Sequence, residues 1–383
     1  MANGWQTTSI GEVVKPIDRA EVPIAGKAYR QIGVRLWGQG AYERETIDGS
    51  QTKYKTLSRV ESGDIIVNKI WARNGSVAVV ADGLSGCFGS SEFPTFAPVR
   101  SKLDPKWFHW ITRTKWFWQA CDEKSQGTSG KNRIRPEKFL EIRIPLPPIE
   151  EQHRILIYIE ELKTKINSIE LYKAEIDADL DRMLLSAYHK IADNSPQKPL
   201  EDVAPLTRRA ATIDSTSKYP QVAVRSFGRG TFHKPNLDGS EITWQKPYLV
   251  KANDILISNI KAWEGAIAVA NETDDGRFGS HRYLTCVPIP NVATSRFVCF
   301  HLLTEEGLSK IGEASPGTAD RNRTLNAKAL MKIPVPVPPI EQQLWFDNLH
   351  DKVASLRELQ SATGEELSAL LPSVLDRAFK GEL

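Results

Sequence analysis

Two long stretches of the chain carry apolar residues at alternating three- and four-residue steps, the spacing of helices that bury one stripe. Lys173 interrupts the first stripe, and Gln360 and Thr363 interrupt the second. The apolar positions are Ile155, Ile159, Leu162, Ile166, Ile169, Ile176, Leu180, Met183 and Ala187, then Phe346, Leu349, Val353, Leu356, Leu367, Leu370 and Val374. About 40 residues make a helix of roughly 60 Å. We expect residues 146–192 and 335–383 to pair as an antiparallel coiled coil. The three polar residues should then meet in a buried layer that sets the register.

Residues 1–145 and 193–334 instead carry short strand patterns broken by turns. Residues 29–35 alternate in the strand manner, and residues 65–67 and 76–80 are short apolar runs behind the turns Gly63-Asp64 and Asn74-Gly75. Residues 107–119 predict a helix whose face of Trp107, Trp110, Ile111, Thr114 and Trp118 is interpreted as core packing. Pro372 lies within the last helical stretch, where a proline can kink a helix. Each of these two segments should be a small α+β domain with a β core.

The second half of the chain repeats the first. A shift of 190 positions aligns Gly38-Gln39-Gly40 with Gly228-Arg229-Gly230, and Phe88-Gly89-Ser90 with Phe278-Gly279-Ser280. Each half then contains a Pro-Pro-Ile-Glu motif, IPLPPIEEQHR from position 144 and VPVPPIEQQL from position 335, where proline suits a helix start. We infer an internal duplication with pseudo-twofold character: domains 1–145 and 193–334, each followed by a helix, 146–192 and 335–383.

Charge is divided between the two kinds of segment. Residues 1–145 hold 22 Lys and Arg against 15 Asp and Glu, and residues 193–334 hold 18 against 15. The helical pieces are acidic, with 6 against 9 in residues 146–192 and 4 against 8 in residues 335–383. This distribution favours domains that meet a polyanion and helices that meet something else.

Other sequence signals limit the classes of protein to which the chain can belong. No apolar run reaches the length of a membrane span, and no signal segment begins the chain. The four cysteines form no CxxC pair, which is typical of buried reduced thiols in a cytoplasmic protein. No GxxxxGK phosphate loop, no GxGxxG and no metal-ligand His or Cys spacing is present. We therefore expect a non-catalytic protein without a metal site.

The order of domain, PxPPxEEQ motif, long helix, domain, PxPPxEQQ motif and long helix ending in RAFKGEL resembles the DNA specificity subunit of type I restriction-modification systems. The resemblance covers nearly the whole chain, although Ser186-Ala187-Tyr188-His189-Lys190 stands where a first RAFxGEL would be expected. It implies two tandem target-recognition domains, each reading one half of a split sequence in double-stranded DNA. It also implies that the helices set the gap and dock two methyltransferase subunits, with a motor-nuclease subunit as a further possible partner. S-adenosylmethionine, and ATP with Mg²⁺, would be used by those partners, and the specificity subunit would bind no cofactor directly.

Side chains that can donate to bases or phosphates mark the candidate DNA-contacting positions. The repeated Asn-Arg pair, Asn132-Arg133 and Asn322-Arg323, lies in a basic loop of each domain. The full candidate set is Arg35, Lys69, Arg73, Ser90, Lys131, Asn132, Arg133, Arg135, Arg225, Arg229, Lys261, Ser280, His281, Arg282, Arg321, Asn322 and Arg323. The candidates for partner docking are the motif residues Pro147, Pro148, Glu150, Gln152, Pro338, Pro339, Glu341 and Gln343.

Two other function classes stay open at this point. The chain could be a scaffolding subunit whose repeats bind proteins, or a DNA-binding protein without an enzyme partner. The charge distribution favours DNA, and a steep salt dependence of binding would separate phosphate contacts from protein contacts.

Overall fold

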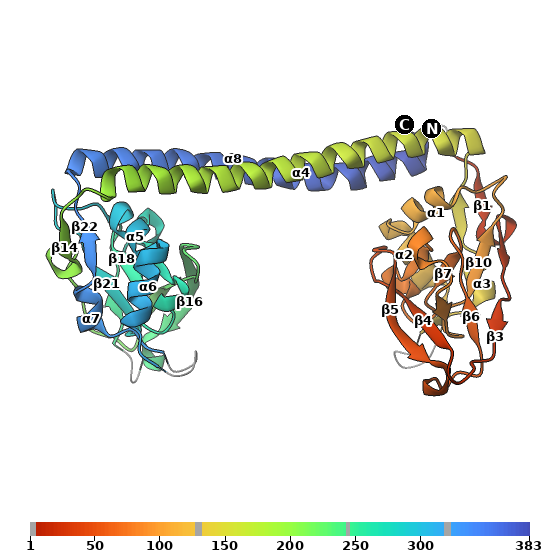
Figure 1. Cartoon of the computed structure of the whole chain (residues 1–383), viewed down its shortest axis with the longest axis horizontal. Coiled ribbons are helices and arrows are strands. Elements are labelled where there is room, and N and C mark those ends of the chain that lie inside the picture. The colour runs from red at the N-terminus through yellow and green to blue at the C-terminus, as the bar shows by residue number, and fades with distance from the viewer. Residues whose placement is uncertain (1–4, 127–131, 243–245, 318–322) are drawn as a thin grey trace. The chain divides into compact units, whose positions relative to one another are not determined.

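The computed structural model describes residues 5–126, 132–242, 246–317 and 323–383. The chain divides into two compact units, one of Met1–Lys173 with Ser361–Leu383 and one of Ala174–Gln360. Each unit contains one β-rich domain and parts of the two long helices (Figure 1). The expected α+β class, with tandem domains and an internal repeat, is confirmed.

The first domain is built around a long hairpin of β4 (Ala28–Val34) and β5 (Ala41–Asp48). This hairpin lies at one side of a five-stranded sheet in the order β3-β6-β9-β4-β5. A second sheet has the order β2-β10-β7-β8, and two pairs, β1-β13 and β11-β12, complete the domain. The remaining bounds are β1 (Thr7–Ser9), β2 (Val14–Pro16), β3 (Ala20–Glu21), β6 (Leu57–Arg59), β7 (Ile65–Val67), β8 (Val77–Val79), β9 (Phe88–Gly89), β10 (Thr95–Pro98), β11 (Ser125–Gln126), β12 (Arg133–Ile134) and β13 (Arg143–Pro145).

The aromatic segment forms two short helices, α1 (Pro105–Ile111) and α2 (Lys115–Glu123), where the sequence predicted one. The break has a local cause. The hydroxyls of Thr112 and Thr114 donate to the carbonyls of His109 and Ile111, which offers the backbone an alternative to a continuous helix. The interpretation of the aromatics as core is confirmed: Trp107 and Trp110 are fully buried and Trp118 is half-buried.

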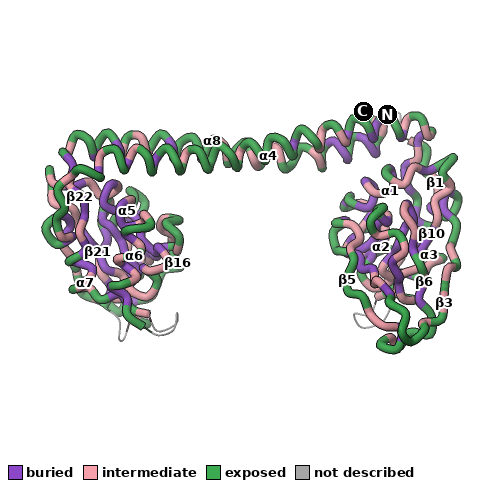
Figure 2. The backbone as a smooth tube through the Cα atoms, viewed as in Figure 1, coloured by how far each residue is buried: buried purple, intermediate pink, exposed green. Residues whose placement is uncertain are grey.

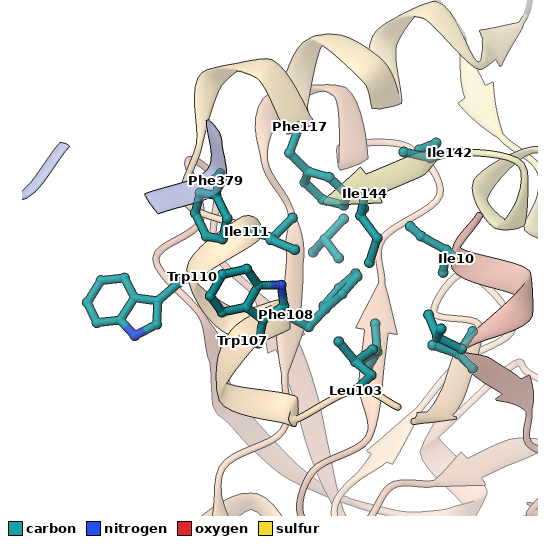
Figure 3. Packing of buried hydrophobic residues seen from close by; sticks show 14 of the residues in the cluster. Ile10, Leu103, Trp107, Phe108, Trp110, Ile111, Phe117, Ile142, Ile144 and Phe379 are labelled. Atoms are coloured by element: carbon teal, nitrogen blue, oxygen red, sulfur yellow. The ribbon is translucent and has the colours of Figure 1, made fainter. Parts of the chain in front are cut away.

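The core of this unit joins the domain to the end of a long helix. Figure 3 shows Phe379, from near the C-terminus, beside Trp107 of α1. Their ring centroids lie 4.9 Å apart. The Trp5 indole donates to the carbonyl of Ala378 at 2.7 Å. The terminal RAFKGEL segment is therefore part of the first unit's core. A third short helix, α3 (Pro136–Leu140), contributes Phe139 to the same cluster.

The second domain repeats these elements. Its long hairpin, β15 (Lys218–Val224) and β16 (Thr231–Asp238), lies 190 positions after β4 and β5. Its sheets have the orders β16-β15-β20-β17 and β19-β18-β21, and β14 pairs with β22. The other bounds are β14 (Gln197–Pro199), β17 (Tyr248–Leu249), β18 (Ile255–Ser258), β19 (Ile267–Val269), β20 (Phe278–Gly279), β21 (Tyr283–Cys286), β22 (Pro334–Pro336), α5 (Ser295–Leu303), α6 (Glu305–Glu313) and α7 (Ala327–Met331).

The two long helices are α4 (Ile149–Ala192) and α8 (Ile340–Lys380). In the first unit Arg154 of α4 donates to the carbonyl of Leu383, just beyond α8. In the second unit Arg357 of α8 donates to Asp181 of α4 at 2.6 Å, and Tyr188 lies in one cluster with Phe346. Within each unit, residues early in one helix therefore meet residues late in the other. The predicted antiparallel pairing is confirmed (Figure 1).

The predicted apolar stripe is only partly buried. Ile155, Ile159 and Ile166 are buried, whereas Ile169, Ile176 and Met183 are exposed, as are Leu356 and Leu370. Figure 2 shows burial concentrated where the helices lie against the domains. In the second unit Leu184, Tyr188 and Ala192 are buried instead of Met183, because the helix turns that side toward the domain core. A pair of helices covers each stripe residue from one side only, so much apolar surface stays open.

The expected buried polar layer is also wrong. Lys173 and Gln360 are half-buried and Thr363 is exposed. Lys173 does lie beside α8: its Nζ is 2.8 Å from the position that a Cβ on Gly364 would occupy. These polar residues are therefore only partly covered, and they are not enclosed as they would be in a core.

Candidate nucleic-acid interface

Three segments of the first domain converge beyond the end of β7: residues 68–75, 90–93 and 132–135. The Lys69 amide donates to the Glu92 carbonyl at 3.1 Å, and the Ile134 amide donates to the Lys69 carbonyl at 2.9 Å. We call these segments the first loop cluster. Segments far apart in sequence thereby bring Lys69, Arg73, Ser90, Asn132 and Arg133, all predicted as DNA-contacting, into one part of the domain.

The side chains of this cluster form a polar cavity beside an ion pair. Arg133 Nη1 lies 3.1 Å from Glu92 Oε1, and the Arg133 side chain is 52% exposed. Glu92 Oε2 is buried and has no hydrogen-bond partner among the described residues. Glu92, Ser90 and Asn68 line a cavity of about 200 Å³ together with Gln31, Arg44, Tyr54 and Trp71. Tyr54 and Trp71 are 45% and 46% exposed, so aromatic faces and hydrogen-bonding groups stand together at the surface.

The second domain has the equivalent second loop cluster, residues 259–265, 280–283 and 323–325. The Asn259 amide donates to the Arg282 carbonyl at 2.8 Å, and the Leu325 amide donates to the Asn259 carbonyl at 2.7 Å. Arg282 therefore occupies the place that Glu92 has in the first cluster, and both are reached by the same backbone bond. The backbone geometry is repeated while the charge at this position is reversed.

The two arginines of the repeated Asn-Arg pair, Arg133 and Arg323, make different contacts. Arg323 Nη2 donates to the carbonyl of Gly312 at 3.0 Å and its Nε donates to the carbonyl of Ser315 at 3.2 Å. Its guanidinium also lies 4.8 Å from the Trp263 ring centroid. Arg323 thus closes the end of α6, whereas Arg133 pairs with the half-buried Glu92. The two arginines of the repeated pair therefore have different surroundings in the two domains.

Lys261 stands beside the same tryptophan, 5.3 Å from its ring centroid. Its ammonium donates to Glu264, and the hydroxyl of Ser226 donates to the same carboxylate. These two donors, Lys261 first, hold the pKa of Glu264 below its usual value. The second cluster therefore has an acceptor that stays ionised beside an exposed cation.

The other predicted residues vary in exposure. Arg35, Arg135, Arg225, Arg229, Lys261 and Arg282 are exposed; Lys69, Arg73, Ser90, Asn132, Ser280, His281 and Arg323 are half-buried. Lys131, Arg321 and Asn322 lie outside the described residues. Sequence reasoning missed Glu92 as part of the cluster. The signal available was the contrast of Glu92 with Arg282 at matching positions.

The docking assignment needs correction at the proline-glutamine motif. Gln152 is fully buried: its Nε2 donates to the carbonyls of Lys102 and Pro147, and its Oε1 accepts from the Asp104 amide at 2.9 Å. Gln343 repeats this arrangement with the carbonyls of Val292 and Pro338 and the Thr294 amide. Side chains with no exposed surface cannot contact another subunit, so both assignments are wrong.

The two prolines of each motif differ in burial, and they differ in the same way in both copies. Pro147 and Pro338 are buried, which contradicts their docking assignment as well, whereas Pro148, Pro339, Glu150 and Glu341 are exposed. The motif is explained by the attachment of each long helix to its own domain, because one glutamine satisfies three backbone groups there.

The cysteines are buried and free: Cys87, Cys121, Cys286 and Cys299. Burial raises the pKa of both the Cys286 and the Cys299 thiols to about 12, which keeps them protonated. Among residues 5–126, 132–242, 246–317 and 323–383, no three His, Cys, Asp or Glu side chains are grouped as a metal site. Within those same residues, no helix has the length and apolar character needed to cross a membrane.

Residues 2–178 match the family model of the type I restriction modification DNA specificity domain. No curated protein matches the chain in sequence.

Two solved structures are similar over the full chain. The HsdS subunit from Thermoanaerobacter tengcongensis aligns with a TM-score of 0.63 at 20% identity, covering 100% of this chain and 98% of that one. A chain from a study of complex assembly and conformational transition of the type I R-M system aligns with a TM-score of 0.71 at 19% identity, covering 100% and 99%. At such identities these two show a shared fold. Residues 2–178, just under half of the chain, are thus similar to the type I restriction modification DNA specificity domain, and the second half of the chain repeats the long hairpin and the helix placement of the first.

Proposed function

We propose that the chain is a DNA specificity subunit that reads a split target, with each domain reading one half. The supporting observation is that the same scaffold presents two loop clusters with different side chains. Glu92 in one and Arg282 in the other stand at equivalent backbone positions. A carboxylate accepts hydrogen bonds from the amino group of cytosine, and arginine donates to the acceptor edge of guanine. Two such clusters read different bases from one fold.

In the first domain the proposed reader is the Arg133–Glu92 pair. An arginine and a carboxylate held 3.1 Å apart offer donors and acceptors side by side, which suits the two bases of one G·C pair. Lys69 and Arg73 are placed beside this pair and are proposed to contact phosphates. We therefore expect a G·C pair in the half of the target that the first domain reads.

The paired helices are proposed to hold the two domains at a set spacing and to bind two methyltransferase subunits. The support is the apolar surface that the helix pair leaves open, including Leu171, Tyr172 and Leu359 at 60%, 61% and 67% exposure. A groove lined by Leu156, Ile157, Glu160 and Lys165 of α4 adds a further concave surface in the first unit. Exposed apolar surface of this kind marks sites of protein association.

The chain itself is proposed to do no chemistry. The methyltransferase subunits would use S-adenosylmethionine, and a motor-nuclease subunit, where one joins, would use ATP with Mg²⁺. The specificity subunit would contribute the choice of sequence and the distance between the two reading sites.

Methylome mapping tests this function. Deleting the gene should remove methylation at one split motif with a fixed gap, and restoring it should return the same motif. Binding of the purified subunit to a duplex with that motif should weaken on the order of a thousandfold between 50 and 200 mM salt, if about six phosphates are contacted. An unchanged methylome, or binding that ignores salt, would contradict the proposal.

A further inference from the structure

An aromatic residue occupies the same strained position at the tip of both long hairpins. Trp37 has φ of 58° and Phe227 has φ of 63°, and each is followed by a glycine with positive φ. In the first tip the Gln39 amide donates to the Leu36 carbonyl at 3.2 Å. This is a two-residue turn with both central residues left-handed, a type I′ turn. Such turns favour Asn, Asp or Gly at the first central position, so an aromatic there runs against local preference in both copies.

Both tips are fastened to their loop clusters by backbone bonds. The Trp37 amide donates to the Asn74 carbonyl at 2.7 Å, and the Gly38 amide donates to the Gly75 carbonyl at 2.9 Å. In the second domain the Phe227 amide donates to the Glu264 carbonyl and the Gly228 amide to the Gly265 carbonyl, both at 2.8 Å. These backbone hydrogen bonds hold each turn in its conformation. A strained conformation persists in a folded protein when the surrounding structure fixes it in this way.

At the tip of the first hairpin the closely packed residue is the glycine that follows the aromatic residue. A Cβ on Gly38 would lie 2.5 Å from the Thr112 carbonyl oxygen. The aromatic side chain stays open: Trp37 is 50% exposed and Phe227 is 70% exposed. The Trp37 and Trp118 ring centroids lie 5.4 Å apart, and Arg229 lies 5.6 Å from the Phe227 ring. The strained backbone at each tip therefore carries an aromatic ring that is at least half exposed. Packing of the ring into the core does not explain why an aromatic residue stands there.

The aromatic persists while its neighbours differ. Leu36 and Gln39 flank the first ring, and Ser226 and Arg229 flank the second. A residue that is kept aromatic, exposed and strained in both halves of a duplicated chain, beside clusters of cations, has a role at the surface. Functional sites are where local preference is overridden in this way.

We propose that Trp37 and Phe227 are DNA-contacting wedges, each pressing its ring against the base stack of the half-target read by its own domain. The inference rests on the proposed function and deepens it. Aromatic rings stack on any base, and apolar wedges pressed between base steps partly unstack and bend a duplex. The wedge would add affinity that does not depend on the base sequence at that step, next to the base-reading groups of the cluster.

The test uses Trp37→Asn and Phe227→Asn, since Asn is favoured at this turn position. Each variant should melt at the same temperature as the parent or a few degrees higher, because the strain is relieved. Its dissociation constant for a duplex with the mapped target should rise roughly tenfold at fixed salt. Trp37→Phe and Phe227→Trp should keep parental affinity. A lower melting temperature with unchanged affinity would show a structural role and overturn the proposal.

A duplex carrying 2-aminopurine at successive positions locates the contact. The parent should raise fluorescence at one step in each half-target, and each Asn variant should abolish the rise in one half only, so each variant is the control for the other. A parent that binds with no rise at any position overturns the wedge and leaves the proposed function standing. A parent that binds no duplex overturns both.

Discussion

At the scale of single residues, the structure gives a physical reason for the repetition of the proline-glutamine motif. The motif resembles a docking signal when read as sequence, because it is repeated and starts each long helix. In the structure Gln152 and Gln343 each bridge two carbonyls and one amide of their own domain. Buried backbone groups need partners, and this side chain supplies them where each long helix begins.

A matched pair of substitutions tests this role. Gln343→Ala should destabilise the second unit by about 2–3 kcal/mol, since the Thr294 amide and two carbonyls lose their partner. Gln342→Ala, at the adjacent exposed position, should change stability by no more than about 0.5 kcal/mol. Urea denaturation of the two variants measures the difference. Equal midpoints would contradict the assignment.

At the scale of elements, the helices were predictable and their burial was not. The apolar spacing identified both long helices and their antiparallel pairing. It also assigned Ile169, Ile176 and Met183 to a buried stripe, whereas all three are exposed. Periodicity reports which side chains share a face of a helix. It does not report whether one helix, a domain or another subunit covers that face.

Pro372 offers a prediction at this scale, because it is exposed and lies inside α8. Proline removes a helical hydrogen bond and crowds the preceding turn, so Pro372→Ala should stabilise the first unit by about 1–3 kcal/mol. Ser373→Ala, also exposed, should contribute a few tenths of a kcal/mol. Thermal melting compares the two. A melting temperature unaffected or lowered by Pro372→Ala would mean that α8 needs the proline in its native path.

At the scale of the whole molecule, duplication explains why one chain presents two related surfaces. The hairpins β4–β5 and β15–β16 are repeated 190 positions apart, and so are the strained tips that they carry. The side chains exposed on the loop clusters have diverged, from Glu92 to Arg282 for example. A duplicated scaffold with diverged loops fits a molecule that recognises two different things at once.

The spacer role predicts the effect of lengthening both helices. One extra heptad in the middle of α4 and one in α8 keeps the apolar pattern in phase and adds about 10 Å of helix. The gap in the methylated motif should change by about three base pairs, while both half sequences stay the same. Methylome mapping of a host carrying the lengthened gene measures both. Altered half sequences with the original gap would refute the spacer assignment.

The sequence by itself determined the fold class, the duplication, the long helices and the resemblance to a known family. These features can be recognised from the periodicity of apolar residues and the spacing of repeated motifs, which are visible in the order of residues. Tertiary structure decided which side chains are buried, which are exposed and which lie next to one another. Only folding brings Glu92 beside Arg133, turns Arg323 onto the end of α6, buries Gln152 and Gln343, and holds Trp37 and Phe227 in a conformation that their local sequence opposes. Those outcomes depend on contacts between segments distant in sequence, and no local pattern contains them.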